Sequence, residues 1–195
     1  GLAGFTVSMA RTLDFHLVEK AYYNNGGDFL LREQGELVGG EPEDDGGGQA
    51  PVSAEAETEE EAHWEFLPAF DYLNLQGVRA VTRVGRYRVR IRWTAGRDEG
   101  MVAGVDREDL LEVAQMRRDY APYSGELLID ALGADPSALL VERRFLRENR
   151  ISVGDRISMT IYMLGQWIEM EFLVAGILDY FPRLYPEDGP FFVGN

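Results

Sequence analysis

The sequence has no cysteine among its 195 residues. This absence excludes disulfides, zinc knuckles, thiol redox chemistry and a cysteine nucleophile. It does not fix the compartment, because a chain of this length buries a sizeable core without disulfides. Long apolar runs are missing too: residues 172–178 form the longest strongly hydrophobic stretch, far short of the roughly 18 to 20 residues that cross a bilayer. We therefore expect that the chain itself does not span a membrane.

Positive charge is scarce, with 19 Lys and Arg residues against 34 Asp and Glu residues and a net charge of −15. Contact with a nucleic-acid backbone or an anionic membrane surface requires clustered positive charge. We expect neither partner. The chain also starts at Gly1 and lacks the charged start and apolar run of a signal peptide, so we interpret it as a fragment of a longer protein.

The negative charge is concentrated in residues 36–61, which hold ten acids, five glycines and no Lys or Arg. Such a stretch repels itself and lacks aromatic residues, so we expect a mobile acidic loop. Setting its ten charges aside reduces the net charge from −15 to −5. The expected organisation is an N-terminal helix and first strand in residues 1–35, this loop, and the remainder of one core domain in residues 62–195, without solenoid repeats.

Hydrophobic periodicity predicts the main elements. Residues 12–23 carry a broad apolar arc at helical spacing, whereas residues 28–32, 78–84, 86–93 and 101–105 have strand patterns, the middle two joined at Gly85. Asp106 is expected to open a helix that continues to about Arg117. The strongest hairpin pattern lies in residues 157–174, where apolar and polar residues alternate on both sides of a turn at Gly165.

Strand and helix patterns follow one another irregularly and not in strict β-α-β order. This arrangement favours the α+β class, with a mixed sheet, packed helices and a C-terminal β-hairpin. At the entry to the hairpin, Gly154 is expected to have a positive φ, which glycine alone adopts without strain.

Residues for catalysis are few. His16 lies on the polar face of its helix beside Glu19, which favours a solvated histidine over a general base. His63 ends the acidic stretch, and ordering a mobile loop around a cation costs entropy, so a specific metal is not expected. The chain has no G-x-S-x-G turn and no P-loop. We expect no catalytic residue, no cofactor and no metal, and hence a non-catalytic domain.

Two further patterns concern surfaces. Arg86, Arg88, Arg90 and Arg92 form a row on one face of a predicted strand, which is more typical of a solvated face, neutralised by acids on a neighbour or by the acidic loop, than of a phosphate site. Near the C-terminus, aromatic residues stand among prolines and are candidates for contact with a partner: Tyr180, Phe181 and Tyr185.

A combination of short motifs resembles a known family. Residues 153–157 read Val-Gly-Asp-Arg-Ile, an alternating strand follows, and residues 172–177 read Phe-Leu-Val-Ala-Gly-Ile. Their order and separation resemble the MacB-like periplasmic core domain of FtsX-like ABC transporter permeases. The resemblance implies that Gly154, Asp155 and Gly176 are structural motif residues, and it implies no catalytic residues.

The resemblance also implies a function. In that family the domain lies on the extracytoplasmic side of the cell membrane, between the first and second membrane-spanning helices. A separate cytoplasmic ABC ATPase would drive the permease helices, and this domain would transmit the movement for export, lipoprotein release or regulation of an external partner. The implied partners are the ATPase through the full-length permease, a second permease subunit and an extracytoplasmic accessory protein.

Two other classes stay open. One is an extracellular ligand-binding or adhesion module without a transporter role, which would use the aromatic and proline-rich end as its contact surface. A hydrolase whose carboxylates converge only in the fold is the other alternative, because the 34 acids allow many pairs to be imagined.

Overall fold

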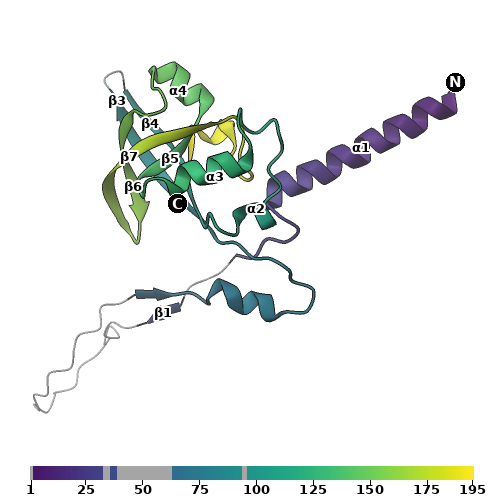
Figure 1. Ribbon diagram of the computed structural model, residues 1–195, viewed down its shortest axis with the longest axis horizontal. Coiled ribbons are helices and arrows are strands. Elements are labelled where there is room, and N and C mark those ends of the chain that lie inside the picture. Colours follow the sequence, from purple (N-terminus) through teal and green to yellow (C-terminus); the bar gives the residue numbers. More distant parts are fainter. Residues whose placement is uncertain (1, 33–35, 39–62, 94–95) are drawn as a thin grey trace, which may run out of the picture.

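The computed structural model describes residues 2–32, 36–38, 63–93 and 96–195 (Figure 1). Most of the acidic stretch, residues 39–62, therefore lies outside the described residues. The elements in chain order are α1 (Leu2–Asn25), β1 (Glu36–Val38), β2 (His63–Glu65), the 3₁₀ helix η1 (Ala69–Asn74), β3 (Val84–Trp93), β4 (Gly96–Val105), α2 (Leu110–Val113), α3 (Gly125–Gly133), β5 (Ala138–Glu142), α4 (Arg143–Asn149), β6 (Arg156–Met163), β7 (Gln166–Leu178), the 3₁₀ helix η2 (Pro186–Asp188) and β8 (Phe191–Gly194).

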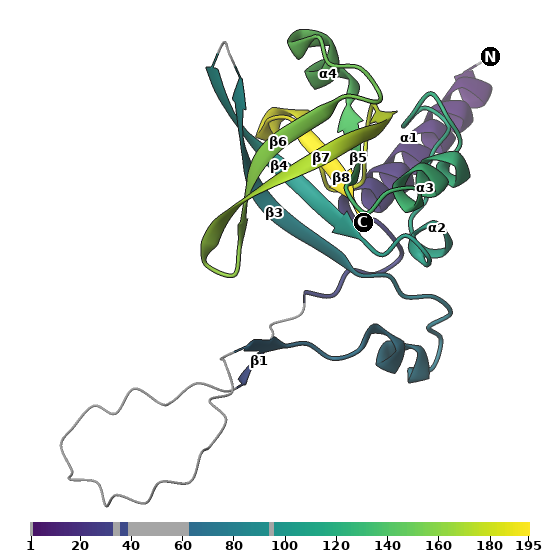
Figure 2. The ribbon, with the colours of Figure 1, turned by 60° about the vertical axis from the view of Figure 1, so that its left-hand side comes forward.

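Six strands form a closed barrel in the order β3-β4-β8-β5-β7-β6 (Figure 2). The β4–β8 and β5–β7 pairs are parallel, and the other neighbouring pairs are antiparallel. β3 and β6 close the barrel through the pairs Val89↔Ile161, Arg90↔Thr160 and Ile91↔Met159. Strands β1 and β2 form a separate two-stranded sheet.

The barrel has an internal two-fold pattern. Exchanging β3, β4 and β5 with β6, β7 and β8 reproduces every pair in the barrel together with its direction. The exchange leaves two strand pairs in place, β3–β6 and β5–β8. Each half is thus a hairpin followed by a crossover and a third strand. The crossover contains α2 and α3 in the first half and η2 in the second.

The predicted α+β fold, a mixed sheet with packed helices and a C-terminal hairpin, is wrong. The sheet closes on itself, and the β6–β7 hairpin is followed by β8, which inserts between β4 and β5. The reason for the error is physical. Alternation in the sequence reports which residues form a strand and which face is buried, but it does not report which distant edges pair.

Two apolar layers stabilise this topology. Alternate residues of all six strands fill the barrel interior, including Val89, Ile91, Met159 and Val174. The residues between them on β4, β5 and β8 face outward and pack in a second cluster that includes Leu128 and other residues of the α2–α3 crossover. Strands buried on both faces explain why residues 138–141 are apolar without alternation.

Several local predictions need correction. Residues 78–83 are not a strand, and β3 runs through Gly85 without a turn. Residues 28–32 form no strand, and the helix expected from Asp106 to Arg117 is reduced to α2 (Leu110–Val113). The strand at 101–105 is confirmed as part of β4. The helix at 12–23 is confirmed and is longer than predicted, because α1 has 24 residues.

The β6–β7 hairpin is confirmed, with Met159 opposite Met170 and a two-residue turn at Leu164 and Gly165. At its entry Gly154 has a φ of +98°, as expected from the sequence. The Gly154 amide donates to Val174 O at 2.8 Å, and the Val174 amide donates to Asp155 O at 2.9 Å. These bonds attach the turn before β6 to β7.

Replacement of Gly154 tests this turn. An added Cβ would meet no atom within 4 Å, so Gly154→Ala changes only the backbone strain and is expected to cost about 1 to 2 kcal/mol of unfolding free energy. Gly104→Ala is the matched control, because its Cβ would make an ordinary 3.7 Å contact with Tyr87 and its φ is not positive. Urea unfolding measures both, and equal midpoints for the two variants would contradict the assignment.

Candidate functional site

The C-terminal end of α1 is the place where the long helix meets the barrel. The rest of α1 projects away from the barrel, with the N-terminus at the far tip (Figures 1 and 2). The helix ends at Asn25, where Gly26 adopts a φ of +82° and its amide donates to Tyr22 O at 2.7 Å. This is a glycine-terminated helix end. Two successive glycines, Gly26 and Gly27, would make a flexible hinge if nothing else held the helix.

Four tyrosines from three parts of the chain meet at this point, and we call them the tyrosine junction: Tyr23, Tyr120, Tyr180 and Tyr185. The ring of Tyr23 lies edge-on to those of Tyr120 and Tyr185, at centroid distances of 5.9 Å and 5.4 Å. Tyr120 is 6.1 Å from Tyr180. Such edge-to-face pairs are each worth about 0.5 to 1.5 kcal/mol beyond the area they bury.

Hydrogen bonds fix the last turn of α1 to the segment that follows β7. The hydroxyl of Tyr23 donates to Leu184 O at 2.6 Å, and the Arg183 amide donates to Tyr23 O at 3.0 Å. Tyr185 donates its hydroxyl to Asn24 Oδ1 at 2.7 Å. All three bonds are made by residues of α1 that precede the two glycines, so these contacts bypass the hinge.

An ion pair adds a second attachment one turn earlier. Arg117 Nη1 lies 2.6 Å from the Glu19 carboxylate of α1, and its other guanidinium nitrogens bind Asp119 at 2.9 Å and 2.7 Å. The hydrogen bonds to Asp119 raise the pKa of Arg117, and the charges of Asp119 and Glu19 add smaller contributions in the same direction, while the same guanidinium lowers the pKa of Asp119. Arg117 therefore stays charged and connects α1 to the chain between α2 and α3.

The tyrosine junction is joined in turn to the end of β7. The amides of Asp179 and Tyr180 both donate to Tyr120 O, at 2.7 Å and 3.1 Å. The Asp179 carboxylate accepts two bonds from Arg143, the first residue of α4, at 2.5 Å and 2.8 Å. A two-point arginine–carboxylate pair holds its geometry better than a single contact does.

Burial favours the neutral form of two tyrosines of the junction, Tyr23 and Tyr120. Burial raises the pKa of Tyr23 well above its usual range, with smaller contributions from Tyr120 and Tyr185. Burial also raises the pKa of Tyr120. A raised pKa means that the contribution of Tyr23 and Tyr120 to stability is fully present below the ordinary tyrosine value of about 10 and declines as the pH rises above it.

The residues predicted from the sequence divide between two regions. Tyr180 and Tyr185 lie in the tyrosine junction, and Tyr180 is 46% exposed, whereas Phe181 is 3% exposed and belongs to the outer apolar cluster. Gly154 and Asp155 lie at the entry to β6. Gly176 is buried on β7, where an added Cβ would meet Leu140 at 2.7 Å, so this glycine permits close packing.

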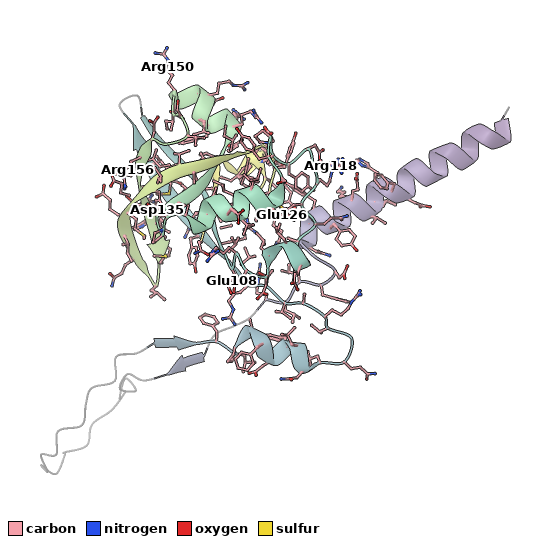
Figure 3. All side chains as sticks on the ribbon, viewed as in Figure 1. Glu108, Arg118, Glu126, Asp135, Arg150 and Arg156 are labelled. Atoms are coloured by element: carbon pink, nitrogen blue, oxygen red, sulfur yellow. The ribbon has the colours of Figure 1, made fainter. Side chains whose placement is uncertain are left out.

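No sequence pattern indicates the remaining tyrosines of the junction or the residues that bind beside them. Tyr23, Asn24, Arg117 and Tyr120 are separated by up to about a hundred positions from each other, and none belongs to a motif. They become neighbours only in the folded structure, where an aromatic cluster forms at the end of α1. In Figure 3 the labelled Arg118 lies near the base of α1, whereas Arg156 lies on the opposite side of the barrel.

The described residues offer little for catalysis. They contain no group of three or more metal-ligating side chains, and Glu142, 6% exposed, is their one buried charged side chain. Burial raises the pKa of Glu142, but no second buried acid faces it within this part of the chain. His16 is exposed on α1, and the side chain of His63 lies outside the described residues.

The arginine row has the surroundings expected of a solvated strand face. Arg90 pairs with Glu99 at 3.0 Å and stacks over Trp167 at 3.9 Å from the ring centroid, and Arg88 lies 5.6 Å from the ring of Tyr162. The pocket beside Arg90 has a volume of about 140 Å³, smaller than the roughly 300 to 1,000 Å³ of typical small-molecule sites. The side chain of Arg92 lies outside the described residues.

Comparison with known proteins adds no relative: no protein-family model matches the chain, and no curated protein is significantly similar to it. Among the described residues, no helix is both long enough and apolar enough to cross a bilayer.

The Tyr23 hydroxyl provides a direct test of the junction. Tyr23→Phe leaves the Leu184 carbonyl without this donor, so we expect a loss of about 1 kcal/mol in unfolding free energy and faster amide exchange in the last turns of α1. Tyr180→Phe is the matched control, because no bond from its hydroxyl to another described residue is observed. Equal exchange rates in the two variants would show that the Tyr23 bond does not hold the helix.

Proposed function

We propose that this chain is the extracytoplasmic domain of an FtsX/MacB-like ABC transporter permease and that α1 transmits movement to the barrel. The observation that carries the proposal is the attachment of α1 through Tyr23, Asn24 and Glu19, ahead of the two glycines. A helix of 24 residues is about 36 Å long. Held in this way, it conveys a displacement along its length, which a flexible glycine linker would absorb.

The closed barrel changes what supports this proposal. The resemblance implied an α+β core domain, and the barrel is not that fold, so fold likeness contributes nothing. Support comes from the order of the motifs at residues 153–157 and 172–177 and from the mechanical attachment of α1. In this proposal the domain is non-catalytic and needs no cofactor.

The proposal assigns partners and a location. The domain lies outside the cell membrane, a cytoplasmic ABC ATPase acts through the full-length permease, and a second permease subunit and an accessory protein are further partners. Phe15, Leu17 and Val18 are exposed on the projecting part of α1. These three side chains point to different sides of the helix and do not form one stripe, but exposed apolar groups on a projecting helix suit contact with other helices of the assembly.

The proposal makes two predictions. The parent polypeptide should contain apolar spans of roughly 20 residues on both flanks of this chain. The isolated domain should not hydrolyse ATP. A parent polypeptide without such spans would instead favour the extracellular ligand-binding or adhesion module.

An insertion experiment tests transmission through α1. In the full-length permease with its ATPase, about seven Gly and Ser residues inserted between Asp14 and Phe15 should abolish ATP-dependent displacement of a label on the barrel. A helical insertion of about seven residues, close to two turns, should preserve it, because rigidity and facing are kept. Fluorescence transfer between the barrel and the membrane measures the displacement. Loss in both variants, or in neither, would contradict transmission through a rigid helix.

A further inference from the structure

Strand β7 extends well beyond the part that the barrel covers. It runs from Gln166 to Leu178, and on one side it pairs with β6 over residues 166–173. On its other side β5 pairs only with residues 173–178. Residues 166–172 therefore have one neighbouring strand, and within the described part of the chain no strand lies against the other edge. Residues 157–163 of β6 and 166–172 of β7 form a hairpin arm, which extends past the barrel in Figure 2.

The backbone groups that face the open edge can be identified. In a two-residue hairpin the pair next to the turn, Met163 and Gln166, exchanges hydrogen bonds. Even-numbered residues of this part of β7 then bond to β6. The odd-numbered Leu173 is consistent with this pattern, because its amide points away from β6 and donates to Ser137 O at 2.9 Å. Trp167, Glu169 and Glu171 consequently direct their N–H and C=O groups outward. We call these three residues the β7 edge.

The corresponding edge of β4 is covered. The internal two-fold pattern relates β7 to β4, and there the Met101 amide donates to Pro190 O at 3.0 Å. Gly189 and Pro190 lie so close to Glu99 and Gly100 that a Cβ on either glycine would overlap a backbone oxygen. Every residue in 166–171, by contrast, is exposed. The β7 edge contains no proline or lysine, and its charged residues are Glu169 and Glu171.

The two faces of the arm differ in chemistry. Glu169 and Glu171 share a face with Trp167, which Arg90 holds in place by stacking. Glu171 also pairs with Arg156 of β6 at 3.3 Å, and both of these side chains remain exposed. On the other face, Ile168 and Met170 are 39% and 40% exposed. A strand added here would therefore place alternate side chains beside carboxylates and beside apolar groups.

We propose that the β7 edge binds, as an added strand, an extended segment of a partner protein in which Lys or Arg alternates with apolar residues. Main-chain bonds to Trp167, Glu169 and Glu171 provide the affinity. The Glu169 carboxylate selects a basic side chain, the exposed Glu171 carboxylate adds negative charge while it pairs with Arg156, and Ile168 and Met170 contact the apolar side chains. The proposal does not depend on the transporter role.

Charge argues against two other occupants. In a second copy of this chain, the antiparallel register that uses all three residues of the β7 edge places Glu169 opposite Glu169, and like charges directly opposite are destabilising. The acidic residues 36–61 of the chain itself carry the same sign as Glu169 and Glu171. A basic segment is the occupant that complements the edge.

The test uses a peptide of alternating lysine and valine and measures amide exchange by NMR in the whole chain. In the free protein the amides of Ile168 and Met170 should be protected, and those of Trp167, Glu169 and Glu171 should exchange rapidly. The peptide should slow the second set at least tenfold. A glutamate–valine peptide, and a lysine–valine peptide with a central proline, should not.

Two variants at position 169 separate the contribution of the main-chain N–H to peptide binding from that of the side-chain charge. Glu169→Pro removes an outward N–H that the β6–β7 ladder does not use and should weaken binding at least tenfold. Glu169→Gln keeps that N–H and should weaken binding only a few-fold, with reduced salt dependence. Should Glu169→Pro fail to fold, the proline-containing peptide gives the same comparison from the ligand side. Absence of binding, equal binding of the acidic peptide, or pairing of the edge with a second copy would overturn the proposal.

Discussion

Pairing between β3 and β6 is the constraint on which the rest of the structure depends. Only three residue pairs join these strands, but they close the barrel and place Val89, Ile91, Met159 and Ile161 in its interior. Closure also fixes where the chain after β7 must run, which brings Tyr180, Leu184 and Tyr185 to the end of α1. The distal part of β7 extends outside the barrel, because β5 reaches only residues 173–178.

Main-chain polar groups have different environments at the tyrosine junction and at the β7 edge. At the end of α1, the carbonyls of Tyr23 and Leu184 are satisfied by an amide and a tyrosine hydroxyl, so helix and barrel are held together despite the two glycines. Along the β7 edge, the main-chain groups are exposed to solvent, and repulsion between glutamates disfavours pairing with a second copy of the chain. One site fixes a distance within the molecule, and the other offers bonds to a partner.

Local physics in the sequence predicted local structure well. Alternation identified the β6–β7 hairpin, and the need for a positive φ identified Gly154. The closed topology was not accessible, because β8 pairs with β4 and β5 across long stretches of chain, and a strand pattern does not name its neighbour. The junction is only partly predictable: the sequence indicates Tyr180 and Tyr185 as candidates for contact with a partner, but only the fold shows that Tyr23 and Tyr120 pack beside them.

Fixed attachment of α1 to the barrel is the central claim, and a distance measurement by electron spin resonance tests it most directly. The chain has no native cysteine, so His16→Cys on α1 and Ser158→Cys on β6 provide two unique sites for spin labels, both of them exposed. A fixed helix predicts a single narrow distance distribution between the labels. A broad distribution, or several separated distances, would show that α1 pivots about Gly26 and Gly27 and would contradict the account.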